Sequence, residues 1–234
     1  MKRIMSFTIM TIIAAALVAK PTPSMSFRSE TQNEKMAIGG ILSMGIAMGI
    51  GDGYAEYMDV NPTWKTPRFA AGGGAYFNYY FAPWFGLHVG LVFVGKGTRY
   101  NGDILNESWH TRLALVYLEL PFALKFNIDR RFQITAGGAL WVAVFGKATT
   151  VAGDVEVEDD FEESDWDSYH RANIGPKVSL AYSIPLGPIN LVPGATWMFH
   201  TVNDLDNDEI PGKDDHQLRM MNVMIDVGVE WFFL

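Results

Sequence analysis

Among the residues that could bind a ligand or catalyse a reaction, Asp and Glu cluster most densely in this sequence. Residues 154–167 contain nine Asp or Glu and no Lys or Arg, and residues 204–215 contain six more against one lysine. Asp204, Asp206 and Asp208 have the spacing of a calcium-binding loop, but Glu209 stands where an EF-hand needs glycine. Runs of like charge repel one another and usually stay solvated. We therefore expect acidic, exposed loops, with these three aspartates as the metal candidate and no cofactor.

Histidine and serine are the other residues that could do chemistry. Ser108 and His110 share a segment with Glu107, and His200 follows later in the chain. Such residues could support acyl hydrolysis or transfer, but a catalytic triad requires convergence in space. The five histidines lack the HxH or HExxH spacing of a metal site, and the chain contains no cysteine. We expect no catalytic site and retain a lipid-modifying enzyme as an alternative.

An alternation with a period of two residues dominates the chain after residue 35. Between residues 114 and 126 the even positions are all apolar, whereas the odd positions include Tyr117, Glu119 and Lys125. This pattern is typical of a β-strand with two different faces. Repeated along the chain, it predicts eight strands near residues 36–50, 68–82, 85–99, 112–127, 131–148, 168–185, 189–202 and 217–233.

The connections between these strands alternate in length. Short links fall near 82–84, 128–130 and 186–188, and long links at 51–67, 100–111, 149–167 and 203–216. Short turns on one side and long loops on the other indicate an antiparallel up-and-down transmembrane β-barrel, with short periplasmic turns and long extracellular loops. A soluble, lipocalin-like binding barrel is the alternative, but it needs a charged outer face. Several predicted strands, such as 69–81 and 132–146, contain no Asp, Glu, Lys or Arg.

Charged residues on the polar face of the strands should point into the lumen. Buried charges need partners, so we expect an ion network in a lumen that eight strands make narrow. A structural plug is the expected role, and a narrow channel is the alternative. The predicted members of this network are Lys96, Glu119, Lys125, Lys177, Asp226 and Glu230.

Aromatic residues gather near the predicted strand ends, as in the girdles that flank a membrane. Tyr100, Trp109 and Trp166 fall near the long-loop end. The short-turn end should carry Phe81, Trp84, Phe85, Phe126, Phe132, Trp231 and Phe233.

The N-terminus has the pattern of an export signal. Lys2 and Arg3 precede an apolar stretch at 4–19 that is too short to span a bilayer. We predict a signal peptide at 1–19, with cleavage as late as residue 26 in an alternative reading, an N-terminal periplasmic segment at 20–35 and a barrel domain at 36–234. The net charge of −8 and the lack of a basic patch argue against nucleic acid as a partner.

Two segments resemble the PorT-like group of outer-membrane β-barrel domains. They are Gly-Leu-His-Val-Gly-Leu-Val-Phe-Val-Gly-Lys-Gly at 86–97 and Tyr-Leu-Glu-Leu-Pro-Phe-Ala-Leu-Lys at 117–125; a Gly-Gly pair at 137–138 and Asn-Ile-Gly-Pro at 173–176 follow. The resemblance implies an eight-stranded barrel in the outer membrane. Members have mostly undefined roles, and a few assist secretion.

Together these observations predict a monomeric, non-enzymatic outer-membrane barrel with a structural, adhesive or envelope-assembly role. Its expected partners are outer-membrane lipid and lipopolysaccharide, and the barrel-assembly machinery during biogenesis. An envelope protein is a further candidate partner. The enzyme alternative would be a lipid A acyl hydrolase or transferase.

Overall fold

The computed structural model describes residues 35–50, 64–104, 107–128, 131–160, 170–201 and 219–233, all of which belong to one compact unit. Its ten strands are β1 Met36–Ile50, β2 Trp64–Ala82, β3 Phe85–Ile104, β4 Glu107–Ile128, β5 Phe132–Ala152, β6 Val155–Asp160, β7 Ala172–Tyr182, β8 Ile184–Leu186, β9 Ile189–Phe199 and β10 Arg219–Phe233. No helix among these residues is long and apolar enough to cross a membrane.

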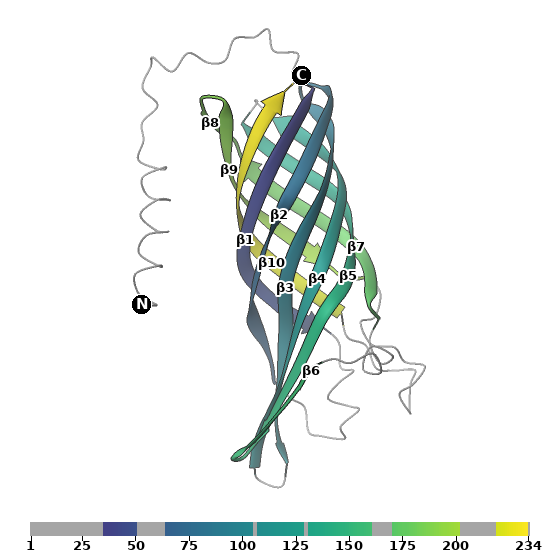
Figure 1. Ribbon diagram of the computed structural model, residues 1–234, viewed down its shortest axis with the longest axis vertical. Helices are drawn as coiled ribbons and strands as arrows, with labels where there is room; N and C mark the ends of the chain where they lie inside the picture. The colour runs from purple at the N-terminus through teal and green to yellow at the C-terminus, as the bar shows by residue number, and fades with distance from the viewer. Residues whose placement is uncertain are drawn as a thin grey trace. The chain divides into compact units, whose positions relative to one another are not determined.

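Eight of the strands form a closed antiparallel ring. Its order is β1-β2-β3-β4-β5-β7-β9-β10, and β10 closes the ring by pairing with β1 from Met36↔Phe233 to Ile50↔Arg219 (Figure 1). β6 pairs only with β5, and β8 extends the hairpin to β9. The predicted eight-stranded antiparallel barrel is therefore confirmed, and closure leaves no free sheet edge within the ring.

The two ends of the barrel differ, as the alternating link lengths predict. The start of β1, the end of β10 and the turns at 83–84 and 187–188 lie at one end (Figure 1). The β3–β4 and β5–β6 hairpins project from the other. In the turn at 187–188, Gly187 has a φ of 74°, a conformation that glycine adopts without steric cost.

Three strand predictions need correction. Residues 100–111 and 149–167 were expected as loops, but β3 and β4 continue to Ile104 and Glu107, and β5 turns at 153–154 into β6. The missed part of β5 has threonines on both faces, at positions 149 and 150, so it lacks the apolar–polar alternation from which the strands were predicted. The third correction concerns 168–185, where the strand breaks at Ser183, whose backbone N–H donates to the carbonyl of Arg131 at 2.7 Å.

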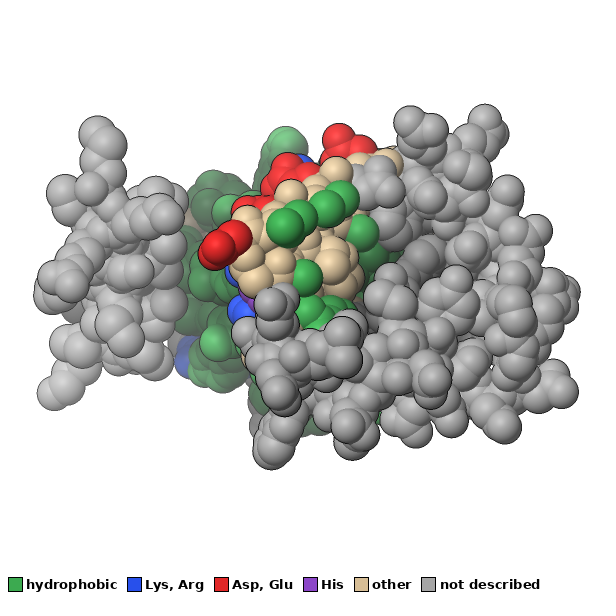
Figure 2. Space-filling view, turned by 90° about the horizontal axis from the view of Figure 1, so that it is seen from below, with side chains coloured by type: hydrophobic (Ala, Val, Ile, Leu, Met, Phe, Trp, Pro, Cys, Tyr) green, Lys and Arg blue, Asp and Glu red, His purple; other side chains and the backbone are tan. Residues whose placement is uncertain are grey.

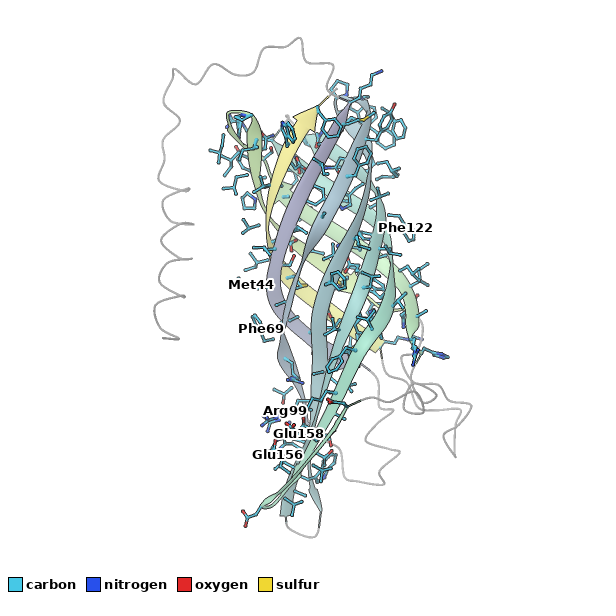
Figure 3. The ribbon with its side chains drawn as sticks, viewed as in Figure 1. Met44, Phe69, Arg99, Phe122, Glu156 and Glu158 are labelled. Atoms are coloured by element: carbon cyan, nitrogen blue, oxygen red, sulfur yellow. The ribbon has the colours of Figure 1, made fainter. Side chains whose placement is uncertain are left out.

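The outer surface of the ring is an apolar layer, which we call the membrane belt. On β4 it consists of the even-numbered residues from 114 to 126, which alternate with the buried odd-numbered ones. Leu42 is 70% exposed and Phe69 72% exposed, and Met44, Phe69 and Phe122 all point away from the barrel (Figure 3). Such apolar exposure on a soluble protein would be costly, whereas lipid accepts it.

The strands approach each other closely where the wall curves. A Cβ added to Gly74 of β2 would lie 2.2 Å from the carbonyl oxygen of Leu91 on β3. At Gly39 of β1 the space for a Cβ is occupied by the ring of Tyr76, its cross-strand partner. Glycine therefore lets backbone and aromatic rings pack where a side chain has no room. The Gly72–Gly74 run lies within β2, inside the strand predicted near residues 68–82.

Candidate functional site

Glu230 of β10 connects four strands inside the barrel. Its carboxylate is buried and forms an ion pair with Lys125 of β4. Asn78 Nδ2 donates to Glu230 Oε1 at 2.9 Å, and Gln133 Nε2 donates to Oε2 at 3.4 Å. The Oδ1 atom of Asn78 lies 2.8 Å from Nδ1 of His88. Because β4 and β10 lie opposite each other in the ring of eight, the Lys125–Glu230 pair crosses the lumen.

A second carboxylate, that of Glu119, lies on β4 six residues before Lys125. It is fully buried, pairs with Lys177 of β7 and accepts a 2.9 Å hydrogen bond from Nε1 of Trp141 on β5. These contacts join three strands at a second level. Each carboxylate is thus both paired and hydrogen-bonded, which is the condition for burying a charge without a large desolvation penalty.

Asp226 is held by hydroxyl groups instead of a cation. Thr196 Oγ1 donates to its Oδ2, and Ser179 Oγ lies 2.7 Å from Thr196 Oγ1. Since the single hydroxyl proton of Thr196 is used on Asp226, Ser179 must donate to Thr196. The result is a chain of hydrogen bonds that joins β7, β9 and β10.

Lys96 of β3 occupies an aromatic enclosure toward the hairpin end. Its Nζ is within hydrogen-bonding reach of Nε2 of His200, and it lies 4.3 Å from the ring centroid of Tyr117 and 4.9 Å from that of Trp141. The ring centroids of His200 and Trp141 are 4.6 Å apart. Cation–π contacts of this kind stabilise a charge away from water. The strands β3 and β9 are opposite in the ring, so this contact also crosses the lumen.

All six predicted lumen charges lie on the inner side of the wall, where they gather around Glu230, Glu119, Asp226 and Lys96. Trp141 joins two of these clusters, because its Nε1 donates to Glu119 and its ring lies beside Lys96 Nζ. Sequence reasoning missed the neutral members of these clusters. The signal for them was available, since Asn78, Gln133, Trp141, Ser179 and Thr196 share the inward parity of their strands.

The two histidines of the hydrolase alternative, whose side chains the structure describes, do not converge. His110 alternates with the buried Trp109 and Thr111 on β4, which places it on the outer face of the wall. His200 lies inside, against Trp141. The side chain of Ser108 lies outside the described ones. His110 and His200 therefore cannot share a substrate across the wall.

Aromatic side chains gather at the short-turn end of the barrel. The ring centroid of Phe85 lies 5.6 Å from that of Phe81, 5.5 Å from that of Trp84 and 5.4 Å from that of Phe126. Trp231 and Phe233 form a second pair on β10, and Phe132 is exposed at the start of β5. At the other end Trp109 is only 4% exposed and packs in the core. It was predicted to lie near an interface, and this placement corrects that expectation.

The metal candidate Asp204, Asp206 and Asp208 lies outside the described residues. Of the acidic segment 154–167, the part within β6 is described, and Glu156, Glu158 and Asp160 are exposed there. Figure 2 shows acidic side chains gathered at this end of the molecule. Lys147 of β5 donates to Glu158 at 2.6 Å, which raises the pKa of this lysine. Within the described ranges, no three His, Cys, Asp or Glu side chains are placed to hold a metal ion.

A match to a family of known proteins agrees with the fold. The model of the outer membrane protein beta-barrel domain family matches residues 31–233. Among solved structures, the chain is similar to the attachment invasion locus protein Ail of Yersinia pestis, with 12% identity over 85% of this chain and 99% of that one, at a TM-score of 0.39. Neisserial surface protein A has 12% identity, with 85% and 97% covered and a TM-score of 0.41.

A third similar structure is OprG of Pseudomonas aeruginosa, with 13% identity, 85% and 96% covered and a TM-score of 0.38. No curated protein matches the chain.

Proposed function

This chain belongs to the outer membrane protein beta-barrel domain family, and from that premise we propose that it is a non-conducting, non-enzymatic scaffold of the outer membrane. Its location in the outer membrane follows from the family and the apolar belt. Membership in the PorT-like subgroup remains a prediction. The proposed role is to hold the β3–β4 and β5–β6 hairpins beyond the membrane for structural or adhesive contacts.

The observation that carries the proposal is the filling of the lumen. Opposite walls are joined by Lys125–Glu230 near the short-turn end and by Lys96–His200 toward the hairpins. The Glu119–Lys177 pair and the ring of Trp141 lie on the inner wall between these two levels. An eight-stranded barrel has an interior only wide enough for its own side chains. Because side chains fill the lumen at several levels, a structural plug is better supported than a solute channel.

Conductance tests this role directly. The folded, full-length protein in planar bilayers should give no discrete current steps, while the same preparation migrates faster on SDS gels before heating than after. Current steps from protein that passes this folding check would contradict the proposal.

The enzyme alternative has a separate test. Lipid A from cells that overproduce the chain should have the same acyl mass pattern as lipid A from cells without it. A changed pattern that His200→Ala abolishes would establish the lipid-modifying alternative and overturn the scaffold role.

We further propose that the hairpins lie outside the cell and the short turns in the periplasm. The chain has no cysteine, so a single introduced thiol reports its own side of the membrane. Val157→Cys on β6, where the native side chain is 57% exposed, should react with a membrane-impermeant maleimide in intact cells. The matched control Pro188→Cys, in an exposed short turn, should react only after lysis. The reverse pattern would invert the orientation.

A further inference from the structure

Three arginines lie together where the strands leave the membrane belt. Arg99 of β3 and Arg112 of β4 are direct cross-strand partners. The Arg68 side chain of β2 reaches β4 beside Arg112, and burial together with the charges of Arg112 and Arg99 lowers its pKa. Arg68 Nη1 also donates to the carbonyl of Leu113 at 2.8 Å. The three side chains thus come from three neighbouring strands.

Arg99 and Arg112 face outward, in line with the belt. On β4 the buried Thr111 and Leu113 point inward, so Arg112 shares the outer face with Ala114 and the belt residues that follow. Arg99 is paired beside it and has the same orientation. In Figure 3, Arg99 lies between Phe69 of the belt and Glu158 of β6. The cluster therefore lies at the depth where apolar contact ends, which in a bilayer is the level of the lipid headgroups.

Carboxylates lie near this cluster but not in contact with it: Glu156, Glu158 and Asp160 of β6 share the face of Arg112, with β5 in between. Like charges directly opposite each other destabilise a strand pair, and no carboxylate in the described part of the chain makes an ion pair with any of the three arginines. The nearest acidic strand is β6, where Glu158 binds Lys147. In the register Thr149 of β5 separates Arg112 from Glu158.

Polar neighbours orient one member of the cluster. Arg99 Nε donates to Oδ1 of Asn101 at 2.7 Å, and Asn101 Nδ2 donates to Oγ1 of Thr66 at 3.0 Å. These bonds use Nε and leave both terminal nitrogens of Arg99 without a described partner. His110, on the same face as Arg112, has its pKa lowered by burial and by the charges of Arg99 and Arg112. These effects disfavour a positive charge on His110.

We propose that Arg99 and Arg112 bind the phosphate group of a phosphorylated lipid in the leaflet on the hairpin side of the barrel. Guanidinium forks bind phosphate oxygens in pairs, and a bound phosphate removes the repulsion between these two neighbouring arginines. A lipid fits better than a soluble anion, because its acyl chains would lie along the belt residues directly below the same arginines. The inference does not depend on whether the lumen conducts.

The test is native mass spectrometry of the detergent-solubilised full-length barrel with lipid A carrying phosphate and with dephosphorylated lipid A of the same acyl chains. Wild-type protein should retain the phosphorylated lipid and bind the dephosphorylated one about tenfold more weakly or worse, as the loss of a charged hydrogen bond implies. Arg99→Gln/Arg112→Gln should lose this difference. Lys147→Gln, which removes a cation of the β5–β6 hairpin, should keep it.

Two further measurements test whether binding depends on paired hydrogen bonds to the phosphate and on the lipid as a whole. Arg99→Lys/Arg112→Lys keeps the charge but not the paired hydrogen bonds, and should bind with intermediate strength. Inorganic phosphate at millimolar concentration should not displace the lipid. Equal binding by wild type and the double glutamine variant, or displacement by inorganic phosphate alone, would overturn the proposal. Heat-dependent mobility on SDS gels verifies that every variant is folded.

Discussion

Single charges in the lumen depend on partners that come from the far side of the barrel. Lys125 has Glu230 as its ion-pair partner, and Glu230 is also bound by Asn78 and Gln133. Removing one member of a buried pair leaves the other charge without full compensation, which costs more than replacing both. The amides reduce this cost but cannot neutralise the charge of Glu230.

We therefore expect Lys125→Met to lower the free energy of unfolding by about 3–5 kcal/mol. The double variant Lys125→Met/Glu230→Gln should recover part of that loss, because it removes the stranded carboxylate charge. Urea titration of the barrel in lipid vesicles, followed by tryptophan fluorescence, measures both. If the double variant were less stable than the single one, the unpaired charge of Glu230 would not be the cause of the lost unfolding free energy.

At the scale of a strand, the two faces of β4 should differ in how much a substitution destabilises the barrel. Leu118 lies on the belt and Glu119 is its buried neighbour in the lumen. Leu118→Arg places a charge in lipid and should cost about 2–4 kcal/mol near the midplane. Glu119→Gln keeps hydrogen-bonding capacity beside Trp141 and should cost less. Folding yield into vesicles, read from the heat-dependent gel shift, compares the two, and equal losses would contradict the assignment of faces.

The pairing of β2 with β3 depends on a glycine that tolerates no side chain. A Cβ at Gly74 would lie 2.2 Å from the backbone oxygen of Leu91, whereas at Gly95 the nearest atom would be 3.6 Å away. Gly74→Ala must therefore displace a strand, while Gly95→Ala meets ordinary van der Waals space. We expect Gly74→Ala to lower the midpoint of urea unfolding and Gly95→Ala to leave it unchanged or raise it. Similar midpoints for both variants would show that the backbone of β2 and β3 shifts easily to accommodate a Cβ at Gly74.

At the scale of the whole molecule, the ring and the projecting hairpins are separable. β5 contacts β7 of the ring through Phe132–Val142, and it pairs with β6 only beyond Gly146. Deleting residues 153–160, which removes β6 and its turn but keeps the pairing of β5 with β4, should therefore preserve the closed barrel. Because loop length changes closure entropy slowly, we expect the unfolding free energy to shift by no more than about 1 kcal/mol. Loss of the heat-dependent gel shift in this deletion would mean that the hairpin is needed to close the ring.

The sequence by itself determined the strand number, the facing of the strands and the membrane location. These features rest on the alternation of neighbouring residues, which is a local property of an extended chain. The even-numbered belt residues of 114–126 and the inward Glu119 and Lys125 illustrate this, because each is placed by its immediate neighbours. The length of the β3–β4 and β5–β6 hairpins could not be predicted from the sequence, because the alternation of apolar and polar residues ends where the strands leave the lipid.

Only the tertiary structure decided which residues meet. Lys125 and Glu230 are 105 positions apart, and the closure and stagger of the ring bring them together. The same is true of Lys96 with His200, and of Arg68 with Arg99 and Arg112. Register is a relation between strands, so a pattern within one strand states which face a residue occupies but not which partner it finds there.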